Sequence, residues 1–292
     1  MASRQQLKRR ITSVRSTKQI TRAMQMVAAS KLRKAQEAAI APREYARHAR
    51  EILTHLRALK DESSDGAGAA LFAEPTVQKR LLIVIASNRG LAGAYNSNVI
   101  RQMIQELKTD KTAGVQTELI TIGRKAAAAA SRISGTDVRA TFEDLPDQPS
   151  ATDLRPILGG AVDTFMDSDI QAVDIIYTEF VSSLRQEVRV QRLLPAGFEE
   201  TEVPASIAAA KIEPSVDELL EVATVRLLEA QLLQVLLEAS ASEHSMRMLA
   251  MKSATDNASD IVEDLTLAYN SARQAAITQE LAEISGGAEA MK

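Results

Sequence analysis

The last third of the chain excludes most globular folds, because it predicts one helix far longer than an ordinary domain can bury. No proline follows Pro214, and no glycine occurs between it and Gly286. The 71 residues from 215 to 285 would span about 105 Å as a helix, whereas helices in globular proteins average roughly 10–14 residues. Ser215 followed by Glu218 is a capping box that predicts the start, and the glycine pair at 286–287 predicts the end.

One apolar seam, with spacings that alternate between three and four residues, runs through this stretch. It consists of Leu220, Ala223, Leu227, Ala230, Gln234, Leu237, Ala241, His244, Met248, Met251, Thr255, Ala258, Val262, Leu265, Tyr269, Ala272 and Ala276. Only Gln234, His244 and Thr255 are polar among these positions, so the pattern is not a chance frame. This spacing is typical of a coiled coil and predicts a partner helix.

Residues 3–60 predict that partner, a second long helix with the same spacing. Its seam consists of Leu7, Ile11 and Val14, then Ile20, Met24 and Val27 with an offset of one residue, then Ala28, Leu32, Ala35 and Ala39. Pro42 is expected to kink or interrupt the helix. Since neither helix buries its seam alone, we predict that the two pair as an antiparallel coiled coil.

The middle of the chain alternates short apolar runs with helical stretches, which predicts a largely parallel sheet covered by helices. Strands are expected at 80–86, 118–123, 138–142, 173–180 and 188–194, with a hairpin at 182–185, and helices at 97–109, from 124 and at 152–167. The predicted organisation is an N-terminal coiled-coil helix (1–60), a linker (61–75), an α/β domain (76–195), a connecting segment (196–213) and a C-terminal coiled-coil helix (214–292).

Charge is distributed unevenly along the chain. Residues 1–60 contain 15 Lys and Arg against 3 Glu, a net charge of 15 − 3 = +12, while the remainder has 20 − 35 = −15. The basic face of the first helix consists of Lys8, Arg9, Arg10, Lys18, Arg22, Lys31, Arg33 and Lys34. Such a face indicates an electrostatic partner, either nucleic acid, a membrane surface or an acidic protein; a transit peptide is a further interpretation.

The sequence lacks the residues that several kinds of chemistry require. Without cysteine there are no disulfides, thiolate sites or thiol nucleophiles, and three histidines offer little to a metal. The loop SNRGLAGAYN at 87–96 follows a strand but lacks both phosphate-binding patterns, so a nucleotide-binding enzyme is not indicated. We predict no catalytic site, cofactor or metal. No apolar run approaches the roughly 20 residues of a membrane span, and no secretory signal is expected.

Three segments suggest a family. They are ITRAMQMVAASKLRKAQ at 20–36, SEHSMRMLAMKSATDNA at 242–258 and LTLAYNSARQAAITQELAEISGGA at 265–288. They resemble the terminal-helix signatures of the gamma subunit of F-type ATP synthases, and the 87–96 loop is similar to that family's. The resemblance covers the whole chain.

The resemblance implies the central rotor shaft of an ATP synthase, a non-catalytic subunit that couples proton flow through the membrane ring to ATP synthesis or hydrolysis in the beta subunits. The implied fold is an antiparallel coiled coil of the terminal helices with a central Rossmann-like α/β domain. Implied partners are three alpha and three beta subunits, the epsilon subunit and the c-ring, without nucleic acid. The implied location is peripheral, on the cytoplasmic face of the bacterial inner membrane. A nucleic-acid-binding coiled coil that uses the basic helix is the alternative.

The resemblance also assigns coupling contacts to matching positions. These are Met24, Arg247, Arg273, Gln274, Thr278 and Glu280. Met24 is expected near acidic loops of the beta subunits, and the Arg273–Gln274 pair is expected to hydrogen-bond to a loop of an empty beta subunit. For Met24 and Thr278, simple packing stays an open alternative.

Overall fold

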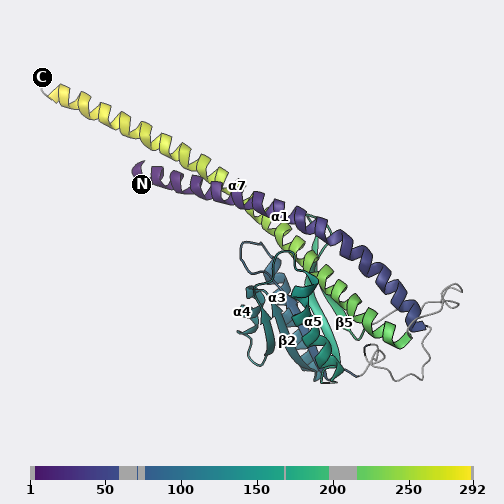
Figure 1. The fold of residues 1–292 in the computed structure, drawn as a ribbon. Coiled ribbons are helices and arrows are strands. Elements are labelled where there is room, and N and C mark those ends of the chain that lie inside the picture. The colour runs from purple at the N-terminus through teal and green to yellow at the C-terminus, as the bar shows by residue number, and fades with distance from the viewer. Residues whose placement is uncertain (1–3, 59–70, 72–75, 168, 197–215, 291–292) are drawn as a thin grey trace. The chain divides into compact units, whose positions relative to one another are not determined.

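The computed structural model describes residues 4–58, 71, 76–167, 169–196 and 216–290. The chain forms two compact units: a helical unit of residues 1–29 and 247–292, and an α/β unit of residues 30–246. The two long helices, α1 (Arg4–Ala58) and α7 (Val216–Ala290), each contribute to both units (Figure 1).

The α/β unit is built on a five-stranded sheet in the order β3-β2-β1-β4-β5. The strands are β1 (Lys79–Ile85), β2 (Gln116–Ile122), β3 (Asp137–Phe142), β4 (Ala172–Phe180) and β5 (Gln186–Leu194). They alternate with α3 (Tyr95–Ala113), α4 (Arg124–Ala130) and α5 (Ala151–Met166). Strands β1 to β4 pair in parallel, and β5 forms an antiparallel hairpin with β4. The predicted, largely parallel sheet is confirmed.

Helices cover the sheet on both faces (Figure 1). Alternate residues of β1, such as Leu81 and Ile83, face a core shared with α5 and with residues 227–239 of α7. The residues between them, Leu82 and Val84, face α3 and α4. This burial on both sides is the reason why the strand is a continuous apolar run in the sequence.

Serine hydroxyls attach α7 to the hairpin end of the sheet. Ser242 Oγ donates a hydrogen bond to the carbonyl oxygen of Thr178 at 3.0 Å, and Ser245 Oγ donates to that of Ser183 at 2.9 Å. Both serines are fully buried. The α7 surface is thus partly polar where it meets the hairpin end of the sheet.

The predicted α7 seam is confirmed, since each member whose side chain is described is buried or half-buried. Its predicted end is wrong, because the helix continues through 286–287 to Ala290. Glycine weakens a helix by only about 1 kcal/mol relative to alanine, so a glycine pair does not by itself end one. The cap at Ser215 lies outside the described residues, as does the side chain of Glu218.

Helix α1 corrects two predictions. It continues through Pro42 without interruption. Its seam keeps one register, because Ile20 and Val27 are 60% and 58% exposed. The seam positions in this register are all buried or half-buried, and Met24 beside them is half-buried too; they are Leu7, Ile11, Val14, Lys18, Thr21, Gln25, Ala28, Leu32, Ala35 and Ala39. The apparent offset arose because polar residues occupy the true seam and apolar ones lie beside it. Most of the predicted linker at 61–75 and connecting segment at 196–213 lies outside the described residues.

Candidate functional site

In the helical unit, the start of α1 and the end of α7 lie side by side and antiparallel (Figure 1). Thr255 Oγ1 of α7 donates a hydrogen bond to Thr21 Oγ1 of α1 at 2.8 Å, and both side chains are buried. Counted outward from this pair, Leu7 lies 21 − 7 = 14 residues away on α1, and Tyr269 lies 269 − 255 = 14 residues away on α7. Leu7 and Tyr269 therefore come to the same level of the pair.

Beyond that level α7 continues past the start of α1 and presents exposed apolar side chains. Ile277, Leu281 and Ile284 are 47%, 61% and 70% exposed. Their spacings of four and three residues place them on one face of the helix. Exposed apolar residues gathered in this way mark a surface that contacts other molecules.

The six predicted contact residues lie at two levels of the helical unit. Met24 is half-buried on α1, and Arg247 is buried on α7. The other four are exposed on α7 beyond Tyr269, and they are Arg273, Gln274, Thr278 and Glu280. Thr278 Oγ1 donates a hydrogen bond to the backbone carbonyl of Gln274 at 3.0 Å, which keeps its hydroxyl on its own helix.

The predicted basic face divides between the two units. In the helical unit, Lys8, Arg9, Arg10 and Arg22 are exposed, whereas Lys18 is half-buried in the seam.

In the α/β unit the same face has partners within the chain. Lys31 Nζ lies 2.6 Å from Asp147 Oδ2, and Arg33 Nε lies 2.9 Å from Glu37 Oε1. The backbone carbonyl of Lys34 accepts a hydrogen bond from Gln148 Nε2 at 3.2 Å. The basic face is therefore not one uniform electrostatic surface.

Polar groups of the loop at 87–96 form hydrogen bonds within the loop and to the start of α4. Ser87 N and Oγ both donate to Asn96 Oδ1, at 3.0 and 2.9 Å. Asn88 Oδ1 accepts the amide of Arg124 at 3.0 Å, at the start of α4. At Gly123 (φ 92°), an added Cβ would lie 2.1 Å from the carbonyl oxygen of Ala86. The amides of Ser87 and Arg124 are therefore both bonded to side chains of this loop.

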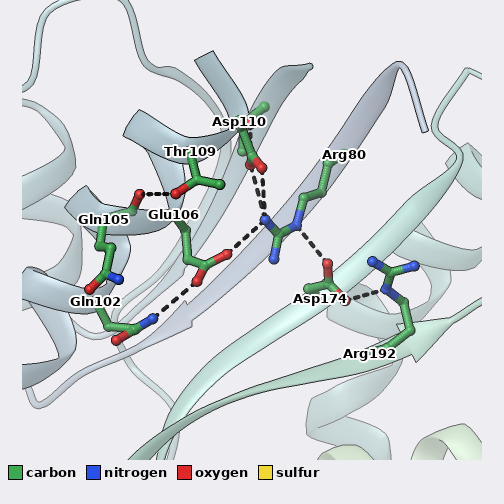
Figure 2. Close-up of polar contacts among 9 residues, drawn as sticks. Arg80, Gln102, Gln105, Glu106, Thr109, Asp110, Asp174 and Arg192 are labelled. Atoms are coloured by element: carbon green, nitrogen blue, oxygen red, sulfur yellow. Dashed lines mark hydrogen bonds and ion pairs between the residues drawn. The ribbon is translucent and has the colours of Figure 1, made fainter. Parts of the chain in front are cut away.

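A buried charged cluster centres on Arg80 at the start of β1 (Figure 2). Arg80 Nε donates to Asp174 Oδ2 at 2.6 Å, and Nη1 donates to Glu106 at 2.9 Å and to Asp110 at 3.0 Å. Arg192 of β5 binds the other oxygen of Asp174. Burial acts to lower the pKa of Arg80, but the carboxylates, Asp174 foremost, outweigh burial and raise it. The cluster joins β1, β4, β5 and α3 as a structural tie.

The described part of the chain offers no group of His, Asp or Glu side chains arranged to hold a metal ion. None of its described helices is long and apolar enough to span a bilayer.

Sequence reasoning did not single out Thr21, Asp147 or Arg80. Thr255 gave a partial signal, as a polar residue in an apolar seam, but its partner is 234 residues away. Arg80 gave another, as a charge at the edge of a strand buried on both faces. Asp147 gave none, since it lies in an irregular loop.

The model of the ATP synthase family matches residues 3–291. The ATP synthase gamma chain of Stenotrophomonas maltophilia is 38% identical over 291 residues, and that of Legionella pneumophila is 36% identical over 293 residues. In both cases the match covers 100% of each chain.

Two solved structures share the fold. A chain of the Euglena gracilis mitochondrial ATP synthase, in its OSCP/F1/c-ring part, matches with a TM-score of 0.67 and 18% identity over 98% of this chain and 93% of that one. A chain of the Tetrahymena thermophila enzyme's central stalk and c-ring matches with a TM-score of 0.60 and 21% identity, over 80% and 99%.

Proposed function

Since this chain belongs to the ATP synthase family as a gamma chain, we propose that its helical unit is the part that turns against the catalytic subunits. The gamma chain is the central rotor shaft of F-type ATP synthase. It couples proton flow through the membrane ring to ATP synthesis or hydrolysis in the beta subunits, and it has no catalytic site of its own.

The observation that supports this proposal is the antiparallel pair itself. Two helices joined along a buried seam resist bending and twisting more than one helix does, which a torque-bearing element requires. The seam ends near Leu7 and Tyr269, and α7 continues beyond it with exposed apolar and polar side chains. That end offers the catalytic subunits an asymmetric surface.

We assign the coupling contacts to residues at the two levels of this unit. Met24 and Arg247 face the lower level of the catalytic ring, and Arg273, Gln274, Thr278 and Glu280 face its upper level. The exposed cations Lys8, Arg9, Arg10 and Arg22 attract acidic loops over a distance without requiring one fixed geometry. A ligand shifts an equilibrium only through differential contacts, so each beta subunit changes state because it meets a different side of the shaft.

The partners follow from the same assignment. The helical unit lies inside a ring of three alpha and three beta subunits, and the α/β unit binds the epsilon subunit and the c-ring. The assembly is peripheral on the cytoplasmic face of a bacterial inner membrane.

A tagged chain, extracted gently from the membranes of its own cells, tests the proposal. We expect two chains of about 50–55 kDa in threefold excess, together with Mg-ATP hydrolysis, as the family resemblance implies. Recovery of the chain alone, or with nucleic acid that high salt removes, would overturn the proposal in favour of a phosphate-binding basic helix.

A further inference from the structure

The loop between β3 and α5, residues 143–150, is held firmly at both of its ends. Phe142, just before it, accepts a backbone hydrogen bond from Gly123 at 2.8 Å. At its other end, the amide and hydroxyl of Ser150 donate to Asp153 Oδ2 at 2.8 and 2.7 Å. The hydrogen bonds from Ser150 lower the pKa of Asp153, so its carboxylate form persists. Pro146 and Pro149 restrict the backbone between these anchors.

From this position the loop contacts helix α1 at two consecutive turns. Lys31 Nζ forms an ion pair with Asp147 Oδ2 at 2.6 Å. The next loop residue, Gln148, donates its side-chain amide to the backbone carbonyl of Lys34 at 3.2 Å. One contact is an ion pair and the other is a hydrogen bond to the helix backbone. Together they fix the position of α1 along its axis and its rotation about that axis, relative to the loop.

The same aspartate also faces helix α7. His244 Nε2 lies 4.0 Å from Asp147 Oδ1, and the His244 ring is buried in the seam. Pro146, Asp147 and Pro149 line a small cavity of about 80 Å³ together with Ser240 and Glu243 of α7. The two carboxylate oxygens of Asp147 therefore point to different long helices.

We propose that Asp147 and Gln148 are positioning residues for rotary coupling, which hold the parts of α1 and α7 inside the α/β unit against the loop that follows β3. The proposal rests on the rotor function and concerns how torque passes within the chain. Two helices joined along one narrow seam can roll about each other. A third element bound to both closes a triangle, which stops that rolling without any contact to the catalytic subunits.

Geometry rather than stability is the expected contribution. The side chains of Lys31 and Asp147 are 42% and 61% exposed, and exposed ion pairs contribute only about 0–1 kcal/mol. Loss of the tie should leave folding and assembly nearly unchanged. It should let part of each rotation of the sheet dissipate as slippage between the sheet and α1.

The experiment uses the assembled enzyme in inverted membrane vesicles and compares protons pumped per ATP hydrolysed. The test variant combines Asp147→Asn with Gln148→Ala, and the single Asp147→Asn is its milder form. The matched control is Asp144→Asn, because Asp144 lies in the same loop but faces Arg124 of α4 at 3.5 Å. We expect the ratio to fall by about twofold or more in the test variant, with full subunit content, and to stay at the wild-type value in the control.

Two further variants separate an internal tie from a contact with other subunits. Lys31→Met should reproduce the effect of Asp147→Asn, and Lys31→Glu combined with Asp147→Lys should restore the ratio. If Lys31→Met lowers the ratio while Asp147→Asn and Gln148→Ala do not, Lys31 acts on another subunit and the tie is overturned. A wild-type ratio in every variant overturns it as well, and neither result affects the rotor function, which depends on co-purification.

Discussion

Thr255 of α7 donates a 2.8 Å hydrogen bond to Thr21 of α1, and both hydroxyls are buried between the paired helices. Thr21 Oγ1 in turn donates to the backbone carbonyl of Lys18 at 3.1 Å. A seam of alanines and aliphatic residues tolerates a slip by one heptad, because the neighbouring frame is also apolar. A buried polar pair disfavours the slip, since it would break the bond between the two hydroxyls and leave each with only a carbonyl of its own helix, that of Lys18 or of Met251.

Valine at these two positions tests whether the threonine pair sets the register. Because valine keeps the shape of threonine and removes the hydroxyl, either single change to Val should lower the free energy of unfolding by about 1 kcal/mol. The double change should cost less than the sum of the two, since either single change already breaks the hydrogen bond between the two hydroxyls. Chemical unfolding of the full chain, followed by circular dichroism, measures all four members of the cycle.

The matched control for this cycle is Thr12→Val. Thr12 is exposed on the same helix and donates to the carbonyl of Lys8, four residues before it, without a partner on α7. It should change stability by less than about 0.5 kcal/mol. Strict additivity of Thr21→Val and Thr255→Val would show that the two hydroxyls do not interact.

A second prediction concerns the turn that joins β2 to α4. Gly123 has φ 92°, and a Cβ there would meet the carbonyl oxygen of Ala86 at 2.1 Å. Gly123→Ala should therefore destabilise the full chain by more than the roughly 1–3 kcal/mol of backbone strain alone. Gly135→Ala isolates that strain, because Gly135 has φ 84° and open space around its Cβ position. Equal losses of thermal stability in the two variants would contradict the role of the close approach.

Local patterns were sufficient to predict the elements of this fold. The strand at 79–85 and the long helix α7 are both predicted from the order of apolar residues, because the strand is buried on both faces and the α7 seam is buried or half-buried. The α1 seam was misread between Val14 and Ala28, where Lys18, Thr21 and Gln25 occupy it. A seam assigned by apolar residues alone includes Ile20 and Val27 there. Which positions are buried depends on contacts with the partner helix, which the sequence of α1 does not contain.

The site was less accessible to sequence reasoning for a related reason. The pairs Lys31–Asp147 and Arg80–Asp174 join residues that are 116 and 94 positions apart. No local period links such residues, so their contacts appear only once the chain is folded. The exposed positions Arg273 and Gln274 are predicted as contacts from the resemblance alone, because a surface that contacts other subunits has no signature in the chain's own packing.

The Arg80 cluster leads to a third prediction. Arg80→Met leaves Glu106, Asp110 and Asp174 close together without the cation that binds four of their oxygens. Removing one partner of a buried ion pair costs about 3–5 kcal/mol, because the remaining charges stay desolvated. Urea unfolding of the full chain measures the loss. Arg139→Met is the matched change on an exposed pair with Glu118 and should cost at most about 1 kcal/mol; similar costs for both would refute a buried network.

The last prediction concerns the exposed Arg273–Gln274 pair on the part of α7 that extends beyond α1. Changing both residues to Ala leaves the helix and its seam intact, because both side chains are exposed and alanine favours helices. If the pair hydrogen-bonds to a catalytic subunit, ATP synthesis in membrane vesicles should fall about tenfold, because two lost hydrogen bonds are worth about 1.4 kcal/mol or more. Subunit content should stay normal.

Asp256→Ala with Asn257→Ala alters a second exposed, adjacent pair on the same helix and should leave synthesis unchanged. Wild-type proton pumping and synthesis in the Arg273 and Gln274 variant would remove this pair from the coupling contacts and leave Met24, Arg247, Thr278 and Glu280 as the candidates.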